Sequence, residues 1–234
     1  MRIAFAASWV HKWIALVVCI QVLLWMASGL FFAVYPIERV RSEHRVAPPR
    51  LEALNAAASL SPKDVAVLLP RAPTRLSYER DARGRAVVIA EFAEGRPALV
   101  DVAENRLASP LTEAAAREIA QAAIQDPPPV SAARLVESES AEYRGALPAW
   151  RVTFRDPEGL VVYVAADTGR ITARRSDLWR LYDALWALHI MDWRDHENFN
   201  NGLLIVAAAL SLLVVITGIV LFPFRLGWPR KRAN

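Results

Sequence analysis

SWVHKWIALVVCIQVLLWMASGLFFAVYPIE, residues Ser8 to Glu38, decides the fold of this chain. No charged residue occurs between Lys12 and Glu38, an interval of 25 positions. About 20 helical residues cross the apolar core of a bilayer, and the stretch lacks the polar face of a soluble-protein helix. We therefore predict a transmembrane helix over residues 9–35. It is predicted to stay uncleaved, because its apolar run exceeds that of a signal peptide and no clear cleavage site follows.

A second uncharged stretch, Gly202 to Phe224, lies near the other end of the chain and predicts a second span over residues 202–224. Each span carries a pair of small residues, Ser28-Gly29 in the first and Thr217-Gly218 in the second, and such residues let helix backbones approach closely. Gln21 could also bond across the contact. Transport pathways usually contain charged intramembrane residues, and neither span contains one in its interior. We therefore expect the two spans to pack together rather than to form a transport pathway.

The charge distribution predicts the topology. All 24 acidic residues and 22 of the 28 Lys and Arg lie between Glu38 and Glu197, so this interval has a net charge of −2. Lys and Arg near span ends are retained in the cytoplasm. We predict a bacterial inner-membrane protein whose termini, residues 1–8 and 225–234, are cytoplasmic and whose central domain is periplasmic. The basic residues that carry this prediction are Arg2, Lys12, Arg225, Arg230, Lys231 and Arg232.

The same distribution excludes a nucleic-acid-binding surface as the source of the net charge of +4, because the central domain mixes both signs. Cys19 is the only cysteine and lies in the first span, so no intramolecular disulfide is possible. The predicted partners are the lipid bilayer and another envelope or membrane protein, and a homodimer is an open alternative.

Between the spans, one pattern of a helix followed by strands occurs twice. A polar connector over residues 36–59 precedes the first copy, residues 60–110, and the second copy covers residues 111–176. Ser61 and Thr112 are typical N-caps, and they predict helices over residues 64–69 and 113–125. Alternating apolar residues predict strands. The predicted strands cover residues 75–79, 86–92 and 98–102 in the first copy, and 134–137, 149–154 and 160–165 in the second.

The second helix is predicted to bury one stripe of side chains, namely Ala115, Ile119, Ala122 and Ala123. The two copies align, with Phe92 matching Phe154 and residues 100–103 matching 162–165. Each copy alone would bury too little surface to be stable. We therefore predict one α+β domain built from two modules, in which each helix covers one face of an antiparallel sheet.

These residues resemble a known family. LTEAAAREIAQAAI, which begins at Leu111, and PAWRVTFRDPEGLVVYVAADTGRIT, which begins at Pro148, resemble the PepSY domain, including its Asp167-Thr168-Gly169 ending. The first copy is degenerate and lacks the Thr-Gly pair. The spans resemble the PepSY-associated transmembrane family through Val10-His11-Lys12-Trp13 and the two small pairs. Without the resemblance, the residue types of Asp167-Thr168-Gly169 predict a turn between strands. In such a turn the Asp and Thr side chains hydrogen-bond nearby backbone groups, and Gly adopts a positive φ.

An aromatic stripe precedes the second span. Trp179, Tyr182, Trp186, His189 and Trp193 recur at spacings of three and four, which places them on one side of a helix. We predict an aromatic helix over residues 177–198 that lies at the membrane interface or rests on the central domain. Packing is the preferred interpretation over a cofactor site, because aromatic side chains suit membrane interfaces.

Four histidines are the remaining chemical candidates: His11, His44, His189 and His196. Multi-span proteins related to the resembled transmembrane family hold haem through membrane histidines, so the resemblance implies haem b as an alternative cofactor held by His11, His44 or His189. His11 and His189 lie at opposite membrane edges, about 37 Å apart on a helix of 25 residues, so they cannot share one haem. His189 with His44, or His11 across a homodimer, stays open.

No catalytic motif occurs: the chain has neither a His-Glu-x-x-His zinc motif, nor a Gly-x-Ser-x-Gly elbow, nor a glycine-rich phosphate loop. We therefore expect no catalytic residues, metal or resident cofactor. The leading hypothesis is a membrane-anchored accessory or inhibitory protein that binds a partner through its PepSY modules, which resemble inhibitory modules. The alternatives are a small haem-binding electron-transfer subunit linked to iron uptake, and a structural subunit of a larger membrane complex.

Overall fold

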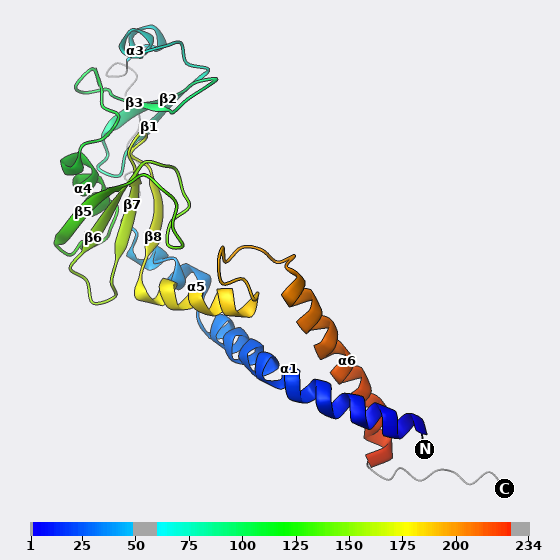
Figure 1. Ribbon diagram of the computed structural model, residues 1–234. Helices are drawn as coiled ribbons and strands as arrows, with labels where there is room; N and C mark the ends of the chain where they lie inside the picture. The colour runs from blue at the N-terminus through cyan, green and yellow to red at the C-terminus, as the bar shows by residue number, and fades with distance from the viewer. Residues whose placement is uncertain (1, 49–59, 226–234) are drawn as a thin grey trace. The chain divides into compact units, whose positions relative to one another are not determined.

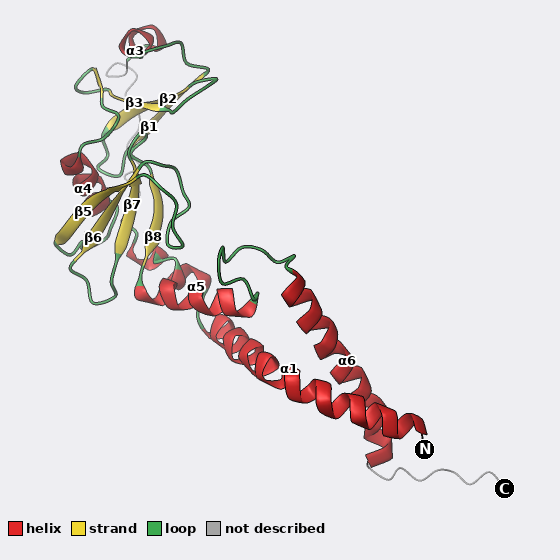
Figure 2. Ribbon diagram, in the orientation of Figure 1, coloured by secondary structure: helices red, strands yellow, loops and turns green. Residues whose placement is uncertain are grey.

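The computed structural model describes residues 2–48 and 60–225, which fold as two compact units. We call residues 1–36 and 182–234 the membrane unit, and residues 37–181 the sheet unit. The sheet unit is α+β, and the membrane unit contains the two long apolar helices (Figures 1 and 2). The predicted fold class is thus confirmed.

The membrane unit is a helical hairpin of α1 (Arg2–Val34) and α6 (Gly202–Arg225). Their membrane-spanning parts are His11–Val34 and Gly202–Pro223, close to the predicted spans. A side-chain contact between His11 and Thr217 places the start of α1 beside the end of α6, so the helices are antiparallel. The less exposed residues of α6 recur every three or four positions, which is the period of two packed helices. These residues are Leu204, Ala207, Leu210, Ser211, Val214, Thr217, Gly218 and Leu221.

Helix α5 (Asp177–His189) is shorter than the helix predicted over residues 177–198. Residues 190–201 form turns instead, because Asp192 accepts hydrogen bonds from four following backbone N–H groups and so stabilises a loop. These bonds, led by that from Asn198, lower the pKa of Asp192 to about 2. Trp193 lies in this loop, outside the stripe in which it was predicted.

The sheet unit contains two antiparallel sheets, with strand orders β1-β2-β3-β4 and β5-β6-β7-β8 (Figure 1). The first sheet consists of β1 (Arg75–Arg80), β2 (Ala86–Glu91), β3 (Ala98–Asp101) and β4 (Arg106–Leu107). The second consists of β5 (Val130–Val136), β6 (Ala149–Phe154), β7 (Val161–Ala165) and β8 (Ile171–Arg175). Six strands coincide with predicted ones, whereas β4 and β8 were not predicted.

Each sheet is preceded by a short helix. Helix α3 (Pro62–Leu68) begins with a capping box between Ser61 and Asp64, and α4 (Glu113–Ala122) begins with Thr112 accepting from the N–H of Ala115. The buried stripe of α4 is Ala116, Ile119, Ala120 and Ala123. The predicted Ala115 and Ala122 are only half-buried. The prediction is confirmed for Ile119 and Ala123 and wrong for Ala115 and Ala122, because alanines on neighbouring faces of the helix do not distinguish those faces in the sequence.

One apolar core joins the two sheets. It combines Ile89 and Leu99 of the first sheet with Phe154 and Val162 of the second, and with Ile119 of α4. The opposite face of the first sheet packs against Val65 and Leu69, around α3. Because alternate side chains of a strand point to opposite faces, the first sheet is buried on both sides, and the two repeats share their hydrophobic core.

The described part of the predicted connector is folded against the sheet unit. It contains α2 (Ile37–Val40) and the 3₁₀ helix η1 (Glu43–Arg45). Arg45 bonds Asp156 at 2.7 Å, and the N–H of Ala47 bonds the carbonyl of Ala123. The rest of this connector, residues 49–59, and the predicted basic tail beyond Arg225 lie outside the described residues.

Candidate functional site

His11 joins the two spans through its Nδ1 atom. This atom lies 3.0 Å from the carbonyl oxygen of Val214 and 2.9 Å from Thr217 Oγ1. Thr217 donates its own hydroxyl proton to the carbonyl of Leu213 at 2.8 Å. The hydroxyl oxygen and the carbonyl therefore both accept, and Nδ1 must carry the proton. Gly218 leaves room for the ring, because a Cβ there would lie 3.3 Å from His11 Cε1.

His189 makes an equivalent contact near the other end of α1. Its Nδ1 lies 2.7 Å from Ser28 Oγ, and Ser28 donates its hydroxyl proton to the carbonyl of Leu24 at 2.7 Å. Trp25 Nε1 also donates to the carbonyl of His189 at 2.7 Å. Burial lowers the pKa of His189, which favours a neutral ring with the proton on Nδ1. In both histidines the Nε2 lone pair is thus directed away from the hydroxyl contact.

The aromatic residues of α5 that belong to the membrane unit pack against α1. The ring of Phe32 lies 4.7 Å from Tyr182, 6.0 Å from Trp186 and 5.5 Å from His189, measured between ring centroids. Trp179, which belongs to the sheet unit, instead lies under the Arg175 guanidinium at 4.0 Å. The predicted stripe is therefore divided between two packing environments.

His11 and His189, two of the predicted haem ligands, are not brought together within one chain. His11 and the His189 partner Ser28 are 17 positions apart on α1, a rise of about 25 Å. His44 lies in η1 of the sheet unit, whereas His11, His189 and His196 belong to the membrane unit. Within residues 2–48 and 60–225, no group of three or more His, Cys, Asp or Glu residues could hold a metal ion.

The most exposed strand edge of the sheet unit is β5. It is an edge strand of seven residues, and along it the solvent exposure is high on both faces. Its backbone bonding follows from two neighbouring contacts: the N–H of Arg155 donates to Pro129 O, and that of Phe154 donates to Leu160 O. Odd-numbered residues of β6 therefore bond toward β5, and even-numbered residues bond toward β7.

In the register of the two strands, the odd-numbered residues of β6 face Ala132 and Arg134. Those two residues direct their backbone groups toward β6, so Ala133 and Leu135 direct theirs away from the sheet. The Leu135 side chain is 42% exposed. Figure 1 shows β5 at the rim of the second sheet. The arrangement is a template for one more antiparallel or parallel strand.

A charged network covers the other face of the second sheet. Glu142 accepts hydrogen bonds from Arg151, Arg180 and the hydroxyl of Tyr163, with Tyr163 at 2.9 Å. Tyr143, from the same loop, stacks on Tyr163 with ring centroids 4.2 Å apart. This network was not predicted from the sequence, because the loop that carries Glu142 has neither periodicity nor a motif.

Glu142→Gln is expected to lower the free energy of unfolding of the sheet unit by about 1–3 kcal/mol at neutral pH, since two half-buried guanidinium groups lose their counter-charge. Burial alone would raise the pKa of Glu142, but the bonds from Arg180, Arg151 and Tyr163 outweigh it, and the pKa is lowered. The carboxylate therefore stabilises the fold above its unfolded pKa of about 4.3. This stabilisation is lost as the pH falls through the folded pKa.

Amide hydrogen exchange of the full chain in detergent, measured on β6 and β7 between pH 7 and the acid limit, checks this expectation. The variant should be less protected at pH 7 and should lose less protection on acidification than the parent. An unchanged acid dependence in Glu142→Gln would contradict the assigned role.

The Asp167-Thr168-Gly169 turn does more than the sequence predicts. Gly169 has φ +69° and Thr168 accepts from the N–H of Arg170, as a turn requires. Asp167, however, accepts two hydrogen bonds of 2.6 Å from the guanidinium of Arg96 in the first repeat. The interpretation that Asp167 serves its own turn was wrong, and this carboxylate instead connects the two repeats.

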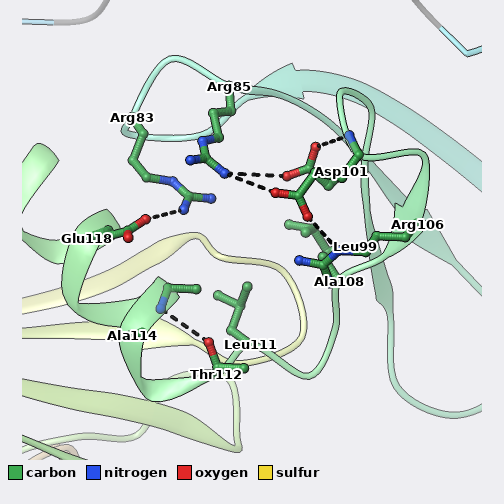
Figure 3. Close-up of a pocket in the computed structure, with 12 residues that line it drawn as sticks. Arg83, Arg85, Leu99, Asp101, Arg106, Ala108, Leu111, Thr112, Ala114 and Glu118 are labelled. Atoms are coloured by element: carbon green, nitrogen blue, oxygen red, sulfur yellow. Dashed lines mark hydrogen bonds and ion pairs between the residues drawn. The ribbon is translucent and has the colours of Figure 1, made fainter.

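A cavity of about 270 Å³ lies between the first sheet and the start of α4 (Figure 3). Its charged side chains are paired with one another: Arg83 with Glu118 at 2.8 Å, and Arg85 more loosely with Asp101 at 3.8 Å. Arg106 bonds Glu104 at the same rim. The cavity therefore offers a charge-compensated surface without a thiol or imidazole among its lining residues.

The family model described as the PepSY-associated TM region matches residues 8–234, which is nearly the whole chain. The chain belongs to this family. It is thus a membrane-associated PepSY protein with two spans, and the resemblance seen in its motifs is confirmed. Comparisons with curated proteins and with solved structures gave no match. The PepSY assignment also covers the two-sheet unit, which lies inside the matched range.

Proposed function

We propose that this PepSY protein is a membrane-anchored accessory protein that binds an extended segment of another envelope protein along the β5 edge. The spans would anchor it in a bacterial inner membrane, with both termini in the cytoplasm. The placement of Arg and Lys at the outer span ends supports this orientation, which puts the sheet unit in the periplasm. In this position the protein would restrain or recruit its partner and carry out no reaction itself.

The observation that carries the proposal is that the outward backbone groups of Ala133 and Leu135, on a seven-residue edge strand, have no strand partner in the described part of the chain. Natural proteins usually protect such edges with short strands, charges or covering segments. In the first sheet the edge strand β4 has only two residues, and the other edge strand, β1, has six. The β5 edge is longer, and strand addition to an exposed edge is a common mode of peptide recognition.

The side chains of β5 indicate what the added strand would carry. Leu135 and Ala133 lie on the face that also bears Trp150, so an apolar residue of the incoming strand would pack there. Arg134 lies on the opposite face, is exposed, and has no ion pair within the described ranges 2–48 and 60–225. A strand that alternates apolar and acidic residues would therefore complement this edge.

Site-specific photo-crosslinking in native membranes tests the proposal. A photoreactive residue at Leu135 is expected to give a covalent adduct of defined mass with one partner, which mass spectrometry identifies. The matched control is Leu107, which is 38% exposed at the short edge of the first sheet. An adduct consisting of two copies of this chain would support self-association instead, and equal adducts from both positions would overturn the proposal.

A second function, haem-dependent electron transfer, is favoured by the two histidine contacts. His11 and His189 each hold their proton on Nδ1 through a helix hydroxyl, which leaves Nε2 available as an axial ligand. Because they lie far apart on α1, each would need a second ligand from another copy or another subunit. When bound, haem would supply one-electron transfer, and these residues would fix the orientation of its ligands.

An absorbance spectrum of the detergent-purified full-length protein, oxidised and then reduced with dithionite, separates the two functions. A Soret band that sharpens on reduction, and that disappears in His11→Ala or His189→Ala but persists in His196→Ala, would establish the second function. A flat spectrum from protein produced with ample haem would reject it and would leave the accessory function in place.

A further inference from the structure

Two neighbouring cavities form a groove where the two repeats meet, on the side of β1 and β8. One has a volume of about 240 Å³ and the other about 260 Å³. They share the lining residues Arg80, Asp81, Ala82 and Ile171. We call the two together the β1–β8 groove. It lies at the edge of the second sheet opposite β5, so it is separate from the proposed strand-binding edge.

Arg174, on β8, lines the first of these cavities. Its side chain is half-buried, and its Nε atom is buried with no hydrogen-bond partner among residues 2–48 and 60–225. Burial lowers the pKa of Arg174, opposed only by the charge of Glu43. No carboxylate among the described residues forms an ion pair with it. The guanidinium of Arg174 is thus partly removed from water and has no counter-ion in the part of the chain described.

The other charges of the groove are already engaged. Arg170 bonds both oxygens of Glu79 at 3.1 and 3.2 Å. Arg80 donates to the carbonyl of Gly84 at 2.6 Å. Asp81 bonds the Arg83 guanidinium and accepts from backbone N–H groups. Arg174 is therefore the charge in the groove that a ligand could complement.

A buried polar group is normally hydrogen-bonded, and one without a partner calls for an explanation. Arginine is suited to bind carboxylates through two parallel hydrogen bonds. Apart from Arg80 and Asp81, the walls around Arg174 are small and apolar, formed by Val46, Ala47, Pro48, Ala82, Ala122, Ala123 and Ile171. Such a cavity admits a carboxylate attached to a short hydrocarbon body, and has no room for a large ring system or a polyphosphate.

We propose that the β1–β8 groove binds the carboxylate of a small aliphatic acid or of a peptide C-terminus, with Arg174 as the charged contact. These two sources share one chemistry, and the experiment below separates them. The inference goes beyond the proposed accessory function, because it does not involve β5. Loss of ligand binding here would leave the β5 adducts unchanged, so failure of one proposal is distinguishable from failure of the other.

The test follows the side-chain Nε–H resonance of Arg174 by NMR in full-length, ¹⁵N-arginine-labelled protein in detergent, assigned by its absence in Arg174→Lys. Propionate and the N-acetylated tripeptide Ala-Ala-Ala are titrated at constant ionic strength, with propionamide and the C-terminally amidated form of the same acetylated tripeptide as analogues that lack the carboxylate. We expect saturable shifts from the carboxylates with a roughly millimolar Kd, and none from the amides. A Kd about tenfold lower for the tripeptide identifies a peptide end, and equal values identify a free acid.

Two variants guard against an indirect effect. Ala82→Leu fills the wall that both cavities share, so it should abolish the shift while Arg174 stays in place. Arg134→Lys, on the far edge of the same sheet, should leave the shift of Arg174 unchanged. The proposal is overturned if the carboxylates leave the Arg174 resonance unmoved, or if the amides shift it equally.

Discussion

Phe154→Ala is expected to destabilise both sheets of the sheet unit together, by about 3–5 kcal/mol. Phe154 belongs to the second repeat and is only 3% exposed. Its cluster also contains Val87, Ile89 and Leu99 from the first repeat. Removing the ring leaves a cavity in a core that both sheets share, so neither sheet can keep its full stability.

Amide hydrogen exchange of the full chain checks this by following β2 and β6 separately. Protection should fall in both strands by a similar free energy. Leu107→Ala is the matched control, because that side chain is exposed and its loss should change protection by less than about 0.5 kcal/mol. Loss of protection confined to the second sheet would show that the repeats fold independently and would contradict the shared core.

Arg96→Ala is expected to destabilise the junction between the repeats by about 2–3 kcal/mol, more than Asp167→Ala. The reason is an asymmetry in burial: the Arg96 side chain is 57% exposed, whereas that of Asp167 is 10% exposed. Without Arg96, a buried carboxylate keeps its charge and loses both 2.6 Å bonds. Without Asp167, the guanidinium can turn into solvent.

A double-mutant cycle tests this reasoning. The variant that lacks both residues should be no less stable than Arg96→Ala, since the unpaired carboxylate has gone with its partner. If the loss of unfolding free energy in the double variant equals the sum of the losses in the two single variants, these two residues are not directly coupled. Chemical denaturation of the full chain in detergent, followed through hydrogen exchange of β3 and β7, gives the three values needed.

Local features of the sequence predicted most of the fold. The spans depend on uncharged runs, and strands such as β6 and β7 depend on alternation over a few residues, so each can be recognised without its neighbours. The two-residue β4 is too short to show a period. Strand β8, with its three polar or charged residues among five, shows no apolar alternation.

The candidate sites were less predictable, because their contacts join distant residues. Arg96 and Asp167 are 71 positions apart, and Ser28 and His189 are 161 apart. Thr217 and Gly218 were correctly expected to lie where the two spans meet, because both contact His11. Ser28 was expected there too, but it bonds His189 of α5 instead, and a Cβ at Gly29 would have no neighbour within 4 Å. The environment of Arg174 could not be predicted, because the sequence does not show whether an arginine has a counter-ion in the folded protein.

The accessory function is tested most directly by the affinity of the cross-linked partner for edge variants of the full-length protein. Leu135→Lys places a charge and a long side chain beside the outward backbone of β5, as natural edge strands do to prevent pairing. We predict at least about tenfold weaker binding, 1.4 kcal/mol, for Leu135→Lys and parent-like binding for Leu107→Lys. Equal affinity of both variants and the parent would contradict partner binding along β5.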